Sequence, residues 1–480
     1  MSEHVAFVVK VNKLEKHPNA DRLMIATFFG NSTMVDLNVK EGDIGIYFPI
    51  DLQLSEEFCA QNNLVRRKDE NGNNVGGYLD PDKRNITAMR LRGSKSEGLY
   101  LPLSCLRYIY GEAEIPLHVG DKFDVLDGHE ICRKYIPLVK SERRAVKNGN
   151  RIRKKKVPLA PLFLEHAETE QLAYNMEAFH SGDQIEITLK MHGTSQRTGY
   201  LPVFKGYKRT FLDWLLRREG KPIYDWGYVT GTRRTVLDNF DGGFYGSNAF
   251  REQHAKFFEG KLHKGEEVYY EVVGYTDTGA TIMGIADNRK TKNKEFIKQY
   301  GEKTVFSYGC EPTGKKVLYG IDDEGSFSIE QPRPQSDFYV YRMTMTNEDG
   351  HVVEYTPDYM RYRCEQMGAK AVPEFAKAVI YNDRVVVIDS TNPNLVSWFC
   401  YPQENETLGD CVKHLAEEFY DGPDPVGKTH VREGVVVRIV NRPSFTAYKH
   451  KNFSFKVLEG IAKADADAPD MEEAEELVEE

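Results

Sequence analysis

The segment DQIEITLKMHGTS (183–195) decides the fold, because it alternates like a strand and ends at a glycine-containing turn. Its apolar and polar positions fall on opposite faces of that strand, Ile185, Ile187 and Leu189 on one and Glu186, Thr188 and Lys190 on the other. Lys190 is therefore predicted to end the strand on its polar side, directly before the turn. An amine nucleophile needs that placement, with a fixed backbone and room for a phosphate to approach. Taken alone, the pattern favours an ordinary surface lysine at a strand end.

Five later segments raise the significance of Lys190 through their order along the chain. Each is strand-like and carries charged or aromatic side chains among alternating apolar ones: VTGTRRTVL (229–237), VYYEVVGY (268–275), FYVYRMT (338–344), VREGVVVRI (431–439) and AYKHKNFSFK (447–456). Alternation places Glu433 on one face with Val435 and Val437. It also places Lys449 and Lys451 together, as a paired ammonium site suited to a triphosphate. One nucleophilic amine, two carboxylates, an aromatic side chain for a base and two further amines make up a nucleotidyl-transfer site.

The composition is that of an ordinary globular protein. The 480 residues suggest roughly two to four domains, and no run of about 18 apolar residues predicts a membrane span. The net charge of -9 is misleading, because residues 464–480 hold nine acidic residues and no Lys or Arg, so the rest of the chain is balanced. The seven cysteines are scattered without a CxxC pair, which argues against structural zinc and fits a reducing cytosol. No secretory signal is visible, so we expect a cytoplasmic protein, in the host cytoplasm if it is viral.

The chain is expected to divide into four parts. Residues 1–139 are β-rich and suggest a small barrel, because VAFVVKV (5–11), GDIGIYFPI (42–50) and GLYLPL (98–103) alternate between polar turns. Residues 140–160 form a basic linker with nine basic residues and one acidic residue in 140–156. Residues 161–462 alternate strands with helix-like pieces, which predicts an α+β domain. Within it, EFAKAVIY (374–381) and LGDCVKHLAEEFY (408–420) have helical spacing. Residues 463–480 form an acidic tail, which its composition predicts to be disordered.

The ordered segments resemble the covalent nucleotidyltransferases, which include ATP-dependent ligases and mRNA capping enzymes. Their first motif, K-x-D-G, reads Lys190-Met191-His192-Gly193 here. The likeness is greatest to ATP-dependent RNA ligases with an N-terminal OB domain, and it covers nearly the whole chain except the acidic tail. It is carried by KMHGTS, the YKHK-x-x-x-F pattern, FLEHAETEQL (163–172), HPNADRL (17–23) and MRLRGSKSEGLYLPL (89–103). The implied fold class is α+β, with an N-terminal OB-like β-barrel followed by a nucleotidyltransferase (ligase adenylylation) domain of antiparallel sheets and helices.

The resemblance implies a role for each matching residue. Lys190 would be the adenylylated nucleophile and Glu271 would bind the ribose or the water shell of a metal. The motif arginine would be Arg233 or Arg234, and the aromatic side chain on adenine would be Tyr341 or, as a second choice, Phe338. Glu433 would organise a metal through water, while Lys449 and Lys451 would hold the α-phosphate and help expel pyrophosphate. His192 departs from the family's Asp, and a neutral His would hydrogen-bond the ribose or a phosphate instead of binding a cation.

The implied activity is an ATP-dependent RNA ligase for RNA repair. It would join 3′-OH and 5′-phosphate RNA ends through a Lys190–AMP intermediate, with ATP and Mg²⁺ or Mn²⁺ as cofactors. RNA is the expected partner, no membrane is expected, and a monomer is expected. One alternative is a DNA ligase or an mRNA guanylyltransferase; these carry an OB domain after the YKHK-type motif, where only 29 residues follow Lys451 here. The other alternative is a non-catalytic RNA-binding scaffold, which predicts an eroded nucleotide site.

Overall fold

The computed structural model describes residues 4–68, 74–135, 158–167, 169–210, 220–237, 239–240, 245, 247–314 and 333–464. The chain divides into two compact units. The first comprises Met1–Ile136, Arg289–Asn293 and Lys456–Ile461, and the second comprises Pro137–Asn288, Lys294–Phe455 and Ala462–Glu480. The basic segment 140–156 and nearly all of the predicted acidic tail lie outside the described residues.

The first unit is built from short antiparallel strands around one apolar core. Its largest sheet has the order β11-β5-β1-β12, formed by Leu99–Pro102, Ile44–Phe48, Ala6–Lys10 and Lys122–Phe123. A three-stranded sheet follows the order β2-β3-β4, formed by Leu14–Lys16, Leu23–Phe28 and Asn31–Asp36. The three strands predicted in this region are confirmed as β1, β5 and β11. The described residues do not form a closed barrel, so the predicted barrel is not confirmed.

Small strand pairs and two helices complete the first unit. The pairs are β6 (Leu52–Leu54) with β15 (Cys132–Lys134), β7 (Arg66–Lys68) with β8 (Asn74–Gly76), β9 (Met89–Leu91) with β10 (Ser94–Ser96), and β13 (Val125–Leu126) with β14 (His129–Glu130). The helices are α1 (Glu56–Gln61) and α2 (Arg107–Tyr110). Phe58 of α1 is fully buried against Phe48 and the rest of this core, which fixes the helix on the sheet.

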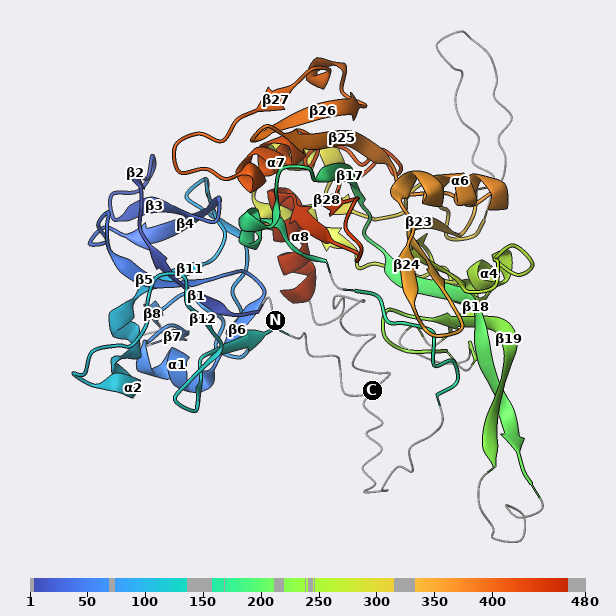
Figure 1. The fold of residues 1–480 in the computed structure, drawn as a ribbon. Helices are drawn as coiled ribbons and strands as arrows, with labels where there is room; N and C mark the ends of the chain where they lie inside the picture. The colour runs from blue at the N-terminus through green and yellow to red at the C-terminus, as the bar shows by residue number, and fades with distance from the viewer. Residues whose placement is uncertain are drawn as a thin grey trace. The chain divides into compact units, whose positions relative to one another are not determined.

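The second unit contains two larger sheets (Figure 1). The seven-stranded sheet has the order β16 (Glu170–Gln171), β29 (Ala447–Lys451), β28 (Gly434–Ile439), β17 (Gln184–Lys190), β25 (Glu374–Tyr381), β26 (Arg384–Ser390) and β27 (Phe399–Cys400). The five-stranded sheet has the order β19 (Lys221–Gly231), β18 (Thr194–Lys208), β20 (Glu266–Gly274), β23 (Ser336–Thr346) and β24 (Val352–Glu354). Because β17 and β18 are consecutive, the turn after Lys190 is where the chain leaves one sheet and enters the other.

Four helices of the second unit lie between strands in sequence: α4 (Ala249–Phe257), α5 (Lys294–Tyr300), α6 (Pro357–Met367) and α7 (Leu408–Glu417). A fifth, α8 (Phe453–Ala464), follows the last strand, and its middle residues belong to the first unit. A two-stranded sheet encloses α5 in sequence: β21 (Ala286–Asp287) precedes the helix and pairs with β22 (Lys303–Thr304), which follows it. The mixture of helices and sheets confirms the α+β class. The helix predicted in 408–420 is confirmed as α7, which begins at a capping box of Thr407 and Asp410.

The prediction of a helix in 374–381 is wrong, because these residues form β25. Ala378 pairs with Ile185 of β17 on one side and with Val387 of β26 on the other, so both edges of the strand are hydrogen-bonded. Helix propensity is a weak determinant of structure even for good helix formers such as alanine, lysine and glutamate, and burial inside a sheet overrides it.

No helix in the described part of the chain is long and apolar enough to cross a membrane.

Candidate active site

A pocket of about 800 Å³, open solvent included, lies in the second unit and is lined from both of its sheets. The seven-stranded sheet contributes Glu186, Thr188, Leu189, Lys190, Val436 and Arg438. The five-stranded sheet contributes Ser195, Glu271 and Tyr341, and the remaining lining comes from His166, Thr169, Met191, Arg233, Met360, Val372 and Phe445.

Lys190 lies at the end of β17, beside this pocket, in a group of opposite charges. Its Nζ is 2.7 Å from Oε1 of Glu433, and Nζ of Lys451 is 3.3 Å from the same oxygen. Lys190, Gly434 and Lys451 stand side by side on three neighbouring strands, which explains how two amines reach one carboxylate. The Glu433 side chain is only 2% exposed. Its negative charge is therefore compensated mainly by these two amines and only slightly by water.

The position of Glu433 differs from the face predicted by alternation. The residue precedes β28, and Gly434 after it has φ 151°, so the regular alternation that governs Val435 and Val437 does not extend to Glu433. A Cβ at position 434 would approach the carbonyl oxygen of His450 to 2.1 Å. Glycine is therefore required here for the close approach of β28 to β29.

His192 faces Glu433 and does not line the pocket. Its Nδ1 is 3.6 Å from Oε2 of Glu433, and its ring lies edge-on to Phe306 and Phe455 at centroid distances of 4.7 and 4.8 Å. The backbone N–H of His192 donates to the hydroxyl of Tyr308 at 2.7 Å. These contacts hold the imidazole next to Glu433, where it packs as an aromatic ring beside a carboxylate.

Glu271 and Gly193 connect the two sheets at the turn. The N–H of Gly193 donates to Oε1 of Glu271 at 3.0 Å, which directs this carboxylate of β20 to the turn after Lys190. A Cβ at position 193 would lie 2.3 Å from the carbonyl oxygen of Val272. The glycine of the K-x-x-G pattern is thus needed for close packing of the turn against β20.

The structure separates the two aromatic candidates. Tyr341 lines the pocket, and its hydroxyl is 2.9 Å from Oγ of Ser195. Phe338 is buried in an aromatic cluster with Phe257, Phe258 and Tyr270. Only Tyr341 is therefore placed to contact a ligand in the pocket.

This difference gives a prediction for the two side chains. Tyr341→Leu should raise the ATP concentration needed for half-maximal reaction by about tenfold, because aromatic stacking on a base contributes about 1–3 kcal/mol. Its melting temperature should change little. Phe338→Leu should lower the melting temperature and leave the ATP dependence unchanged. Thermal unfolding and ATP titration of both variants test this, and the reverse pattern would assign the base contact to Phe338.

Arg233 lies at the cationic end of the pocket. It lines the pocket together with Arg438, whereas Arg234 does not line it and accepts through its carbonyl from Arg197. Burial, followed by the charges of Arg233, Arg342 and Arg197, holds the pKa of His166 well below its usual value. His166 is therefore neutral there, and the positive charge of this end belongs to the arginines.

Lys449 lies on the pocket face of the seven-stranded sheet. It pairs with Val436 of β28, which pairs in turn with Thr188 of β17, so these three residues form the row next to that of Lys190. Lys449 and Lys451 thus share a face, as predicted, but neither is among the residues that line the pocket.

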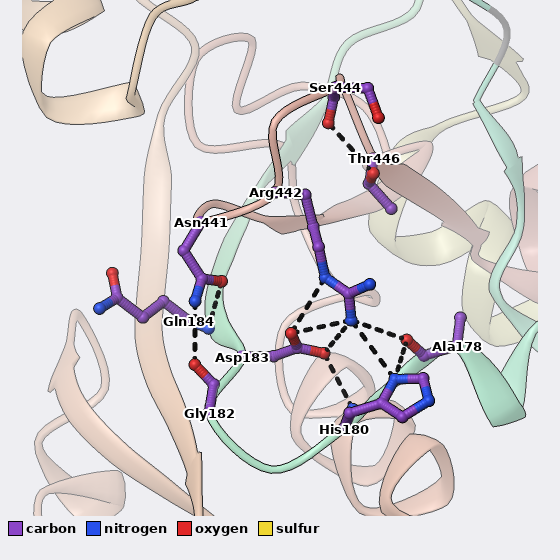
Figure 2. A network of polar contacts seen from close by, with 9 residues as sticks. All are labelled: Ala178, His180, Gly182, Asp183, Gln184, Asn441, Arg442, Ser444 and Thr446. Atoms are coloured by element: carbon purple, nitrogen blue, oxygen red, sulfur yellow. Dashed lines mark hydrogen bonds and ion pairs between the residues drawn. The ribbon is translucent and has the colours of Figure 1, made fainter.

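Sequence reasoning missed Phe445, which lines the pocket from the loop between β28 and β29. Its ring lies 4.7 Å from the guanidinium carbon of Arg342 and 5.1 Å from that of Arg438. Figure 2 shows the contacts that hold this loop: Arg442 donates to Asp183 at 2.7 Å, and Asn441 donates to the carbonyl of Gly182 at 2.9 Å. A loop residue does not belong to any strand or helix pattern, so the sequence contains no periodic signal for Phe445. The only signal near it in the sequence is Arg442.

The donor set fits a divalent cation held mainly by water and phosphate. No group of three His, Cys, Asp or Glu side chains gathers in the described residues, so an all-protein cage for a metal is absent from that part of the chain. Oε2 of Glu433 is nonetheless buried without a hydrogen-bond partner. Mg²⁺ commonly binds through one or two carboxylates plus substrate phosphates, and it keeps several waters.

The two sheets, the lysine at their junction and the order of the strands give the chain the fold of an RNA ligase. The solved structures that establish this fold are of Naegleria gruberi RNA ligase. A mutant of that ligase with AMP and Mn has a TM-score of 0.51 and 14% sequence identity, over 95% of this chain and 98% of that chain. The ligase with PPi gives the same four values. No family model matches the sequence, and no curated protein matches it.

Proposed function

We propose that this protein is an ATP-dependent RNA ligase that seals 3′-OH and 5′-phosphate ends. The observation that carries the proposal is Lys190, which ends β17 beside a pocket lined from both sheets, with its amine 2.7 Å from the buried carboxylate of Glu433. The likeness to Naegleria gruberi RNA ligase structures with AMP, ATP and PPi supports the same reading.

The reaction has three steps. Lys190 first gives up its ammonium proton to solvent; its neutral amine then attacks the α-phosphorus of ATP, a P–N bond forms, and pyrophosphate leaves. The 5′-phosphate of RNA then attacks the same phosphorus, which transfers AMP to the RNA end and returns the lysine. Finally a 3′-hydroxyl attacks the activated 5′-phosphate, a phosphodiester forms and AMP leaves.

Each residue has a proposed part in the first step. Tyr341 stacks on adenine and Glu271 accepts from the ribose. Arg233, at the cationic end, contacts the ribose or the incoming 5′-phosphate, and Lys449 and Lys451 neutralise the phosphates and the departing pyrophosphate. Preorganised charges of this kind stabilise the transition state without reorganisation. His192 acts indirectly, through its contact with Glu433.

Glu433 and Glu271 would hold Mg²⁺ or Mn²⁺ when it is bound. The metal would neutralise phosphate charge and keep the attacking and leaving atoms in line.

The first unit is proposed to be an OB-like nucleic-acid-binding domain over residues 1–139, followed by the basic linker (140–160), the adenylylation domain (161–462) and the acidic tail (463–480). Its exposed short strands and the nine cations of 140–156 support substrate binding. A monomer acting in the cytoplasm is proposed, in keeping with seven free cysteines.

The activity is tested with ATP labelled with ³²P at the α-phosphate and a divalent metal, followed by denaturing electrophoresis. We expect a labelled protein band that requires ATP and is lost on chase with 5′-phosphorylated RNA. A parallel reaction with GTP separates a ligase from a capping enzyme. Absence of any labelled band from the folded, full-length protein would contradict the proposal.

A further prediction concerns Lys449. Lys449→Ala should reduce the rate of adduct formation by about tenfold at low ATP concentration, because a charge-assisted contact to phosphate is lost. The fold should be intact, since the side chain is half-exposed on a strand. An ATP titration of the adduct measures this, and adduct formation at the normal rate at low ATP would show that Lys449 is only a solvated strand residue.

A further inference from the structure

Two consecutive backbone N–H groups in the turn after Lys190 are bonded by side chains from other parts of the chain. The N–H of Gly193 donates to Glu271 of β20, and the N–H of His192 donates to the hydroxyl of Tyr308 at 2.7 Å. The proposed function uses Glu271 and gives Tyr308 no part. Both bonds restrain the short segment that joins Lys190 to β18, so the hydroxyl of Tyr308 acts on the backbone that carries the nucleophile.

Tyr308 lies in a tight turn that disfavours a tyrosine. The N–H of Cys310 donates to the carbonyl of Ser307 at 2.8 Å, and the two central residues, Tyr308 and Gly309, have φ of 49° and 77°. Positive φ at both central residues is typical of a type I′ turn, in which Gly, Asn and Asp predominate. A bulky side chain in this conformation is rare and strained, and such positions cluster at functional sites. The turn alone therefore does not explain why a tyrosine stands here.

The ring and the hydroxyl of Tyr308 have separate contacts. The residue is 3% exposed, and its ring lies edge-on to the buried ring of His430 at a centroid distance of 4.6 Å. A phenylalanine would make the same ring contact, so packing does not account for the hydroxyl. Burial, followed by the charge of Asp424, holds the pKa of Tyr308 well above its usual value, so the hydroxyl stays protonated. Its contribution is therefore a hydrogen bond and not a proton transfer.

We propose that Tyr308 is a positioning residue for the nucleophile, because its hydroxyl holds the turn that follows Lys190. This inference rests on the proposed ligase function and adds a residue to its first step. Attack on phosphorus needs the amine within a narrow range of distance and direction, and a displacement of about 1 Å can cost about 100-fold in rate. A looser turn should slow the attack without weakening ATP binding, since Tyr308 is not among the residues that line the pocket.

The first test removes only the hydroxyl from the full-length protein. Tyr308→Phe should lower the single-turnover rate of Lys190–AMP formation at saturating ATP by about tenfold, because the N–H of His192 loses this hydrogen bond. The ATP concentration for half-maximal rate should not change. Tyr228→Phe is the matched control, since the hydroxyl of Tyr228 also accepts from a backbone N–H, that of Gly260 at 2.6 Å. This control should react at the wild-type rate.

Two further measurements separate positioning from general damage to the fold. Sealing of RNA that already carries AMP on its 5′-phosphate needs no lysine nucleophile, so Tyr308→Phe should perform it at the wild-type rate. Backbone hydrogen exchange, followed by mass spectrometry, should become faster in the peptide that contains His192 and stay unchanged in peptides of the first unit.

The turn itself gives an independent variant. Gly309→Ala places its Cβ in open space, so it acts only through the unfavourable positive φ, and it should displace Tyr308 and slow adduct formation. Gly301→Ala is the matched control, because Gly301, directly after α5, has φ 79° and equally open space. Both substitutions should lower the melting temperature, whereas only Gly309→Ala should slow formation of the adduct.

The outcomes distinguish this inference from the proposed function. If the wild type forms the adduct and Tyr308→Phe forms it equally fast, the positioning role is wrong and the ligase proposal stands. Equal slowing of adduct formation and of sealing of adenylylated RNA would assign Tyr308 to folding and would also overturn the role. If Tyr308→Phe does not fold, the two glycine variants decide, and equal rates for them would overturn it. A folded wild type that forms no adduct would mean that the ligase proposal itself fails.

Discussion

Lys190→Ala and Lys190→Arg should both abolish the protein–AMP adduct. The amine of Lys190 lies at the end of β17 beside the pocket, and the described residues place no other lysine in the pocket lining. Alanine removes the nucleophile. Arginine keeps the charge and much of the length, but its guanidinium stays protonated and cannot attack phosphorus. The measurement is incorporation of α-labelled AMP into protein at saturating ATP and metal.

A matched control lies on the neighbouring strand of the same sheet. Lys377 of β25 is paired with Asp358 at 2.7 Å, and Lys377→Ala should form the adduct at the normal rate. Both Lys190 variants should still seal RNA that carries AMP on its 5′-phosphate beforehand, because the last step needs no lysine nucleophile. Adduct formation by either variant at the wild-type level would refute the assignment of Lys190.

The strand that carries Lys190 was predictable because its two faces differ in chemistry. Ile185, Ile187 and Leu189 are all buried, and the polar face of the strand borders the pocket. Alternation in one short segment therefore located both the sheet and the candidate nucleophile. The order of the later segments then placed Glu271 and Tyr341 in the same pocket, although they come from the other sheet.

Sequence periodicity gave a wrong prediction in two places: at the end of a strand, and in a segment whose tertiary contacts outweigh its local helical pattern. Glu433 is one residue outside β28, so its direction is set by Gly434 and not by the period of the strand. The segment 374–381 has helical spacing, but hydrogen bonding on both edges makes it a strand. Neither fact is local in sequence, since the first depends on the approach of His450 and the second on two other strands.

The pocket residues that stand out least in the sequence were the least predictable. Arg438 and Phe445 complete the pocket, yet in the sequence they are an ordinary strand arginine and a loop phenylalanine. Their positions follow from how β28 and β29 are joined, and the Asp183–Arg442 contact that holds this loop spans 259 residues of sequence. No local pattern encodes a contact of that separation.

Glu433→Gln and Glu433→Ala should both lower the rate of adduct formation by about 100-fold, with the fold retained. The buried carboxylate accepts from Lys190 at 2.7 Å and from Lys451 at 3.3 Å. Hydrogen bonds between charged groups contribute about 1.5–3 kcal/mol each, and about 1.4 kcal/mol corresponds to tenfold in rate. Without the carboxylate, two ammonium groups face each other and the lysine amine loses the contact that orients it. An amide of the same shape does not restore the charge.

The measurement is the single-turnover rate of adduct formation, with thermal unfolding of each variant as the test of folding. Glu374 is the matched control, because it is also a carboxylate of the seven-stranded sheet paired with two cations, Arg361 at 2.6 Å and Lys377 at 3.6 Å. It does not line the pocket, so Glu374→Gln should react at close to the wild-type rate. Equal rates for Glu433→Gln and Glu374→Gln would show that the Lys190–Glu433 contact is an ordinary buried ion pair. A large defect confined to Glu433→Gln would instead show that its charge, held at the junction of the two sheets, acts on the nucleophile.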